Sequence, residues 1–79
     1  MTPKNMVKAA GRAADDATAE FGRAWPRLSK DAQRGAVAVH VIAAFESYGL
    51  ASKAADVIVV MRSAWDIAGC GPDSPRETT

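Results

Sequence analysis

Residues 30–48 read KDAQRGAVAVHVIAAFESY, and this stretch decides the fold class. Ser29 is a good helix N-cap just before it, and Gly49 is a good C-terminal stop just after it. Within residues 36–45 only His40 is polar. A helix that is apolar on almost every side is buried on almost every side, so we expect the central helix of the domain or a subunit interface. The polar residues form one narrow stripe, expected to be exposed: Gln33, His40 and Ser47.

The preceding segment, residues 3–25, also predicts a helix, because its apolar residues recur every three or four positions. Thr2 and Pro3 supply an N-cap followed by a proline at the first helical position, and Pro26 predicts the end of the helix. The residues of its apolar face are Met6, Ala10, Ala14, Ala17, Phe21 and Ala24.

A third helix is predicted over residues 53–68, capped by Ser52 and ended by Gly69. The β-branched run at residues 57–60 also favours a strand, and this alternative stays open. Residues 70–79 have no apolar periodicity and are expected to form a flexible C-terminal tail. The main apolar face of the third helix contains Val57, Ile58, Met61, Ala64, Trp65 and Ala68.

These elements predict an all-α domain, a small three-helix bundle over residues 1–69. Alanine contributes 17 of the 79 residues, and its high helix propensity and small side chain favour thin, closely packed helices. A single domain of this length buries a modest core, and its one cysteine excludes an internal disulfide. We therefore expect association with another chain, including a possible homo-oligomer, to add buried surface.

The net charge of +1 conceals an uneven distribution along the chain. Residues 1–34 hold seven Lys/Arg and four Asp/Glu, whereas residues 35–79 hold three Lys/Arg and five Asp/Glu. No run of 18 apolar residues predicts a membrane span, and the N-terminal region lacks the apolar segment of a secretory signal. The sequence therefore predicts a cytoplasmic protein without a membrane partner.

No pattern for catalysis, for a cofactor or for a metal ion is visible in the sequence. His40 and Cys70 are the only residues of their kinds and fall on different predicted elements. Asp15 and Asp16 are adjacent, so their side chains diverge on a helix, and the glycines are too scattered for a nucleotide-binding loop. We predict a non-enzymatic protein without cofactors, in which both His40 and Cys70 are dispensable.

The basic excess gathers around the predicted turn between the first two helices, where Trp25 lies among Arg23, Arg27, Lys30 and Arg34. Basic groups around an aromatic side chain bind phosphates or an acidic protein surface, although an ordinary solvated corner remains an alternative. The last two predicted helices make a poor DNA-binding helix–turn–helix. Phe45 occupies a crossing position that needs a small residue, and the third helix offers few side chains for reading bases.

The apolar residues exceed what a three-helix unit of this size is expected to bury. We assign the surplus to a contact surface, because contiguous exposed apolar patches mark interaction sites. The alternative is a compact bundle that covers all of them. The residues assigned to this apolar interface are Val37, Val41, Tyr48, Val59, Val60 and Ile67.

Together these features predict a protein–protein interaction module that binds a larger protein or protein complex. A short chain without a pattern for catalysis fits a regulator or a stoichiometric inhibitor, of the kind that phages and mobile elements encode against host machinery. Anti-CRISPR proteins are one such class, although no family motif is recognisable in these residues. The alternative hypothesis is a small nucleic-acid-associated protein that uses the basic residues between Arg23 and Arg34.

Overall fold

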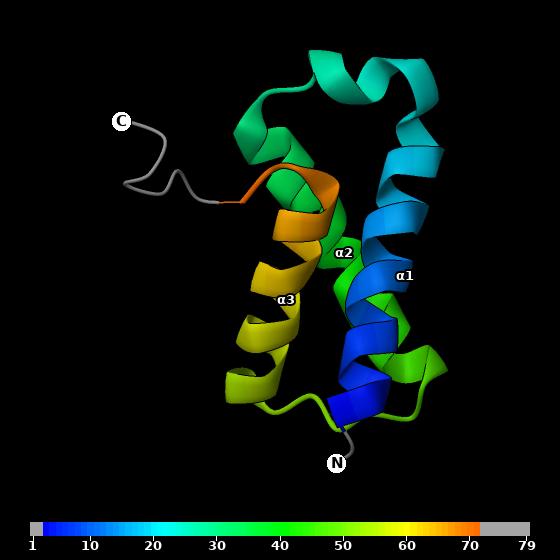
Figure 1. Cartoon of the computed structure of the whole chain (residues 1–79), viewed down its shortest axis with the longest axis vertical. Coiled ribbons are helices and arrows are strands. Elements are labelled where there is room, and N and C mark those ends of the chain that lie inside the picture. Colours follow the sequence, from blue (N-terminus) through cyan, green and yellow to red (C-terminus); the bar gives the residue numbers. More distant parts are fainter. Residues whose placement is uncertain (1–2, 72–79) are drawn as a thin grey trace.

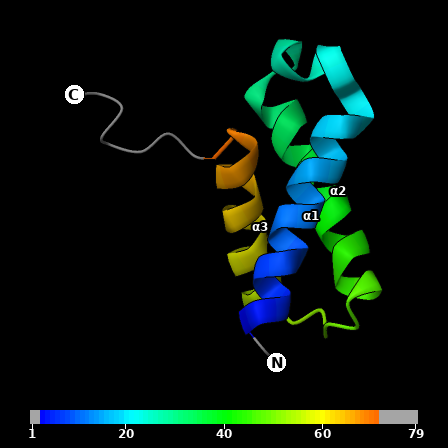
Figure 2. The same ribbon diagram turned by 45° about the vertical axis from the view of Figure 1, so that its right-hand side comes forward.

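The computed structural model describes residues 3–71, and these residues confirm the all-α class and the three-helix bundle. Helices α1 and α3 run side by side in the same direction, and α2 runs in the opposite direction across both of them, so that each helix lies against the other two (Figures 1 and 2). The elements in chain order are α1 (Pro3–Phe21), the 3₁₀ helix η1 (Gly22–Arg27), α2 (Lys30–Ser47) and α3 (Ala54–Ala68).

Alanine gives α1 its contact face. Five alanines of α1 are at most 2% exposed, and they follow the spacing of three and four residues that keeps side chains on one side of a helix. Methyl side chains let the backbones of α2 and α3 approach α1 closely. The five residues are Ala9, Ala10, Ala13, Ala14 and Ala17.

The bulk of the core comes from α2, α3 and the residue after Gly69. The largest fully buried side chains are Phe45, Val37, Val41, Val60 and Cys70. The assignment of Val37, Val41 and Val60 to an exposed interface was therefore wrong. Val37 and Val41 lie on the same side of α2 as Phe45, where the small α1 face leaves room for them.

The other predicted interface residues divide into two groups. Tyr48 is half-buried and packs against the core, so it is not part of an open apolar surface. Val59 and Ile67 are exposed, at 56% and 57% of their surfaces. Phe21, expected in the core, is 37% exposed, because α1 ends at this residue.

Helix boundaries differ from the predicted ones where local backbone geometry decides them. The first helix ends at Phe21 because Gly22 adopts φ +52°, a left-handed conformation that favours glycine, and Pro26 lies inside η1. Ser29 caps α2 as predicted, accepting a hydrogen bond from Ala32 N at 3.1 Å. The third helix is capped at Lys53 and not at Ser52.

The C-terminal ends of α2 and α3 follow the sequence prediction. Leu50 N donates to Phe45 O at 2.8 Å, and Cys70 N donates to Trp65 O at 2.9 Å. Gly69 takes φ +81° to allow the second of these bonds. The run at residues 57–60 lies within α3, so the strand alternative was wrong.

Two substitutions in α2 test which of its sides is core. Phe45 is fully buried, so Phe45→Ala is expected to lower the free energy of unfolding by about 3–5 kcal/mol. Ile42 is 58% exposed, so Ile42→Ala is the matched control and should change that free energy by no more than about 0.5 kcal/mol. Urea denaturation followed by circular dichroism measures both values. Equal losses for the two variants would contradict the orientation of α2.

Candidate functional site

The predicted basic cluster is split in two by the fold. Lys30 and Arg34, one turn apart on α2, both reach the C-terminal end of α3. Lys30 Nζ donates to Gly69 O at 2.6 Å, Arg34 Nε donates to Cys70 O at 2.7 Å, and Arg34 Nη2 donates to Gly71 O at 3.1 Å. Two of the four cations proposed for a partner are thus engaged within the chain.

Arg34 also contacts the side chain of Trp65. Its guanidinium carbon lies 5.9 Å from the centroid of the Trp65 ring, and Trp65 Nε1 donates to the backbone oxygen of Arg34 at 3.1 Å. Asp31 adds a weak ion pair at 3.7 Å, with its own side chain almost fully exposed. We name Lys30, Arg34 and Trp65, with the carbonyls of residues 69–71, the C-terminal clamp.

The clamp has a clear electrostatic basis. The carbonyls of residues 69–71 directly follow the last residue of α3, Ala68, and cations close to the C-terminal end of a helix interact favourably with the helix dipole. Arg34 of the clamp binds the backbone oxygen of Cys70, whose side chain is fully buried in the core, and this burial raises the pKa of the Cys70 thiol. The prediction that residues 70–79 form a flexible tail was wrong for Cys70 and Gly71, and residues 72–79 lie outside the described part.

The remaining members of the basic cluster lie within η1. Arg23 and Arg27 are exposed, and Trp25 is half-buried beside Phe21, with a ring-centroid distance of 6.2 Å. Gln33 Nε2 donates to Trp25 O at 2.7 Å. Gln33 is only 6% exposed, so its assignment to an exposed stripe was wrong, and its amide instead fixes the turn between η1 and α2.

His40 has a structural partner that the sequence pattern did not predict. Its Nε2 lies 2.9 Å from Glu20 Oε1, which joins α2 to α1, and its side chain is 24% exposed. Part of the predicted polar stripe of α2 is therefore used for packing between helices. Within residues 3–71, no group of three or more His, Cys, Asp and Glu side chains is arranged to hold a metal ion.

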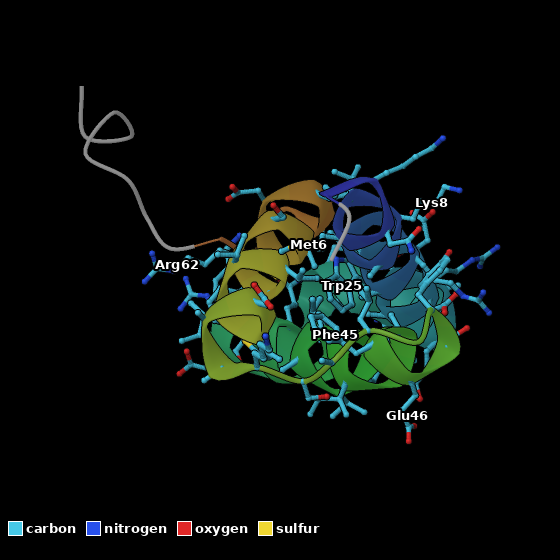
Figure 3. All side chains as sticks on the ribbon, turned by 90° about the horizontal axis from the view of Figure 1, so that it is seen from below. Met6, Lys8, Trp25, Phe45, Glu46 and Arg62 are labelled. Carbon is cyan, nitrogen blue, oxygen red and sulfur yellow. The ribbon has the colours of Figure 1, made fainter. Side chains whose placement is uncertain are left out.

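The outer side of α2 carries exposed apolar residues. Val39 is 66% exposed and Ile42 is 58% exposed, and Gly35 and Ala43 lie within one turn of them on the same side. We name Gly35, Val39, Ile42 and Ala43 the α2 ridge. Glu46 follows the ridge on α2 and points away from the bundle in Figure 3, and exposed Asp31 precedes it.

A second exposed apolar area lies on the opposite side of the bundle, where α1 and α3 run side by side. A hollow of about 170 Å³ lies there between the two helices. Figure 3 shows Met6 between α1 and α3, on the side away from α2. The hollow is lined by Met6, Val7, Val59, Val60 and Ser63.

Val7, at 70% exposure, is the most exposed of the large apolar side chains in the described residues. Val59, Ser63 and Ile67 follow one another at intervals of four residues, so they share one side of α3. On α1, Gly11 follows Val7 at the same interval. We name Val7, Gly11, Val59, Ser63 and Ile67 the α1–α3 face.

Neither area coincides with the predicted interface, because the α1–α3 face contains two residues of that interface and the α2 ridge contains none. Only Val59 and Ile67 of that interface are exposed. Among residues 3–71, no helix is both long enough and apolar enough to cross a membrane. Comparison with protein families, with curated proteins and with solved structures finds no match to this chain.

The C-terminal clamp yields a direct test. Arg34→Ala removes two charged hydrogen bonds and the contact with the Trp65 ring, so it should lower the free energy of unfolding by about 1.5–3 kcal/mol. It should also speed the reaction of Cys70 with a thiol reagent under native conditions, because Arg34 holds the backbone of this buried residue in place. Arg27→Ala, at an exposed position, is the control and should leave both measurements unchanged. Wild-type labelling kinetics in Arg34→Ala would show that the clamp does not hold residues 69–71.

Proposed function

We propose that this chain is a non-enzymatic protein-binding module of the cytoplasm. Its α2 ridge is the surface that contacts a larger protein. The single observation that carries the proposal is the exposure of Val39 and Ile42, at 66% and 58%, on a helix whose other side forms the core. Covering an aliphatic side chain gains about 1.5–3 kcal/mol, so an exposed pair on a rigid helix favours a partner. A stoichiometric regulator or inhibitor, of the phage or mobile-element kind, fits a small chain that works by covering a surface.

The charges around the ridge indicate the chemistry of the partner. Asp31 and Glu46 lie near its two ends, while the basic residues of α2, Lys30 and Arg34, reach towards the end of α3. A single helix with aliphatic side chains between two acidic ends fits an apolar groove flanked by Lys or Arg. We therefore expect the partner to present such a groove.

The alternative function, nucleic-acid binding by the basic cluster, has less support. The clamp engages Lys30 and Arg34 with backbone carbonyls, which leaves Arg23 and Arg27 as exposed cations around η1. Affinity for nucleic acid at physiological salt depends on the number of phosphates that basic side chains neutralise. Two arginines beside one half-buried tryptophan provide a weak site of this kind.

Affinity capture from the native host, followed by mass spectrometry and nucleic-acid staining, separates these functions. Three baits are compared: the wild type, Val39→Asp/Ile42→Asp and Arg23→Glu/Arg27→Glu. Wild type and the arginine variant should retain the same larger protein. The amount of that protein captured by the ridge variant should be at least about tenfold lower, because every 1.4 kcal/mol of lost binding free energy is a factor of ten in affinity. Circular dichroism confirms that each bait is folded.

Two outcomes would contradict the proposal. Equal capture of that protein by the ridge variant would exclude the α2 ridge as the contact surface. Capture of nuclease-sensitive nucleic acid that disappears with Arg23→Glu/Arg27→Glu would establish the alternative function instead.

A further inference from the structure

The α1–α3 face has a pattern that fits a second copy of itself. Large apolar side chains lie towards its two ends, and small residues lie in the middle. Val7 and Val59 line the hollow at one end, and Ile67 projects at the other. Gly11 and Ser63 lie between them in sequence, and nothing lies within 4 Å of the Cβ position of Gly11.

We infer that the α1–α3 face forms a homodimer with the same face of a second copy, related by a two-fold axis that makes the paired helices antiparallel. A two-fold interface uses one surface patch twice, so the patch must be complementary to itself. The proposal does not depend on the α2 ridge, which lies on the opposite side of the bundle and stays open in such a dimer.

Apolar complementarity follows from the spacing along α3. If the axis passes at Ser63, then Val59 and Ile67, four residues before and after it, exchange places. Ile67 of each copy then meets the hollow beside Val59 of the other copy. The hollow, about 170 Å³, is large enough for one branched aliphatic side chain, since an apolar cavity of about 150 Å³ accommodates benzene. Each copy supplies one projecting side chain and one hollow.

Charge complementarity follows from α1. With the axis at the level of Gly11, Lys8 lies three residues to one side and Asp15 lies four residues to the other. Antiparallel pairing therefore brings Lys8 of each copy close to Asp15 of the other. Both side chains are exposed, and neither makes a salt bridge within residues 3–71.

On α3 the charges are less symmetric, because Arg62 lies one residue before Ser63 and Asp66 lies three residues after it. Figure 3 shows Lys8 and Arg62 on opposite flanks of the bundle, so the charges border the apolar area and do not interrupt it. Antiparallel pairing therefore joins opposite charges on the α1 flank. Parallel pairing of α1 with α1 would instead place Lys8 against Lys8 and Asp15 against Asp15.

Sedimentation velocity of the full chain at concentrations from about 1 to 200 μM tests the inference. The wild type should pass from monomer to dimer within this range. Ile67→Asp should weaken the dimer at least tenfold while staying folded by circular dichroism, because Ile67 is exposed in one copy. Ile42→Asp, on the α2 ridge, is the matched control and should leave the dimer intact.

Charge reversal tests the antiparallel register. Lys8→Glu alone places two acidic groups together and should weaken the dimer, whereas Lys8→Glu/Asp15→Lys restores opposite charges with their positions exchanged and should restore it. A wild type that stays monomeric up to 200 μM would overturn the proposal. A dimer that survives Ile67→Asp but is lost in Ile42→Asp would overturn it as well, and would place the contact on α2. Failure of the double reversal to restore affinity would exclude this register.

Discussion

The structure depends on the close approach that alanine permits along α1. Five alanines occupy the side of α1 that faces the other two helices, and each of them is almost completely buried. Because this face adds so little bulk, Phe45, Val37, Val41 and Val60 fill the space between the three helices. A chain of 79 residues thereby forms one continuous core from short helices.

The small contact face of α1 also leaves some apolar residues of the bundle exposed on its surface. Once one side of α2 fills the space beside α1, its opposite side has no partner among residues 3–71, and Val39 and Ile42 stay exposed. On the other side of the bundle, α1 and α3 leave a hollow between them. The two apolar areas are thus a consequence of how a thin α1 packs, and both the proposed partner contact and the proposed dimer use them.

The C-terminal clamp explains how α3, the shortest of the three α-helices, is held. Helix α3 has 15 residues, and isolated helices of about this length are marginal in water. Lys30 and Arg34 satisfy the carbonyls of residues 69–71, and Trp65 ties the last turn of α3 to the backbone of α2. Two of the four basic side chains that the sequence assigned to a binding site, Lys30 and Arg34, therefore stabilise the fold.

The fold class, the three helices and most of their ends could be predicted from the sequence, because caps, glycine stops and helical periodicity are local signals. Which side of α2 is core could not. Almost every side of α2 is apolar, so periodicity does not distinguish Val37 from Val39, and the position of α1 decides between them. The clamp was also beyond prediction, since Arg34 and Cys70 are 36 residues apart. The surplus of apolar residues in the sequence indicated exposed apolar surface, but only the packed structure shows where on the bundle that surface lies.

Small side chains on α1 set the helix spacing, and Ala13→Leu is the substitution that tests this dependence. Ala13 is fully buried, so the larger side chain should overpack the core and lower the free energy of unfolding in urea by about 1–3 kcal/mol. Ala19→Leu, at an exposed position of the same helix, should leave that free energy unchanged within about 0.5 kcal/mol. If Ala13→Leu is as stable as the wild type, the helices are not held at the distance that alanine permits, and the account is wrong.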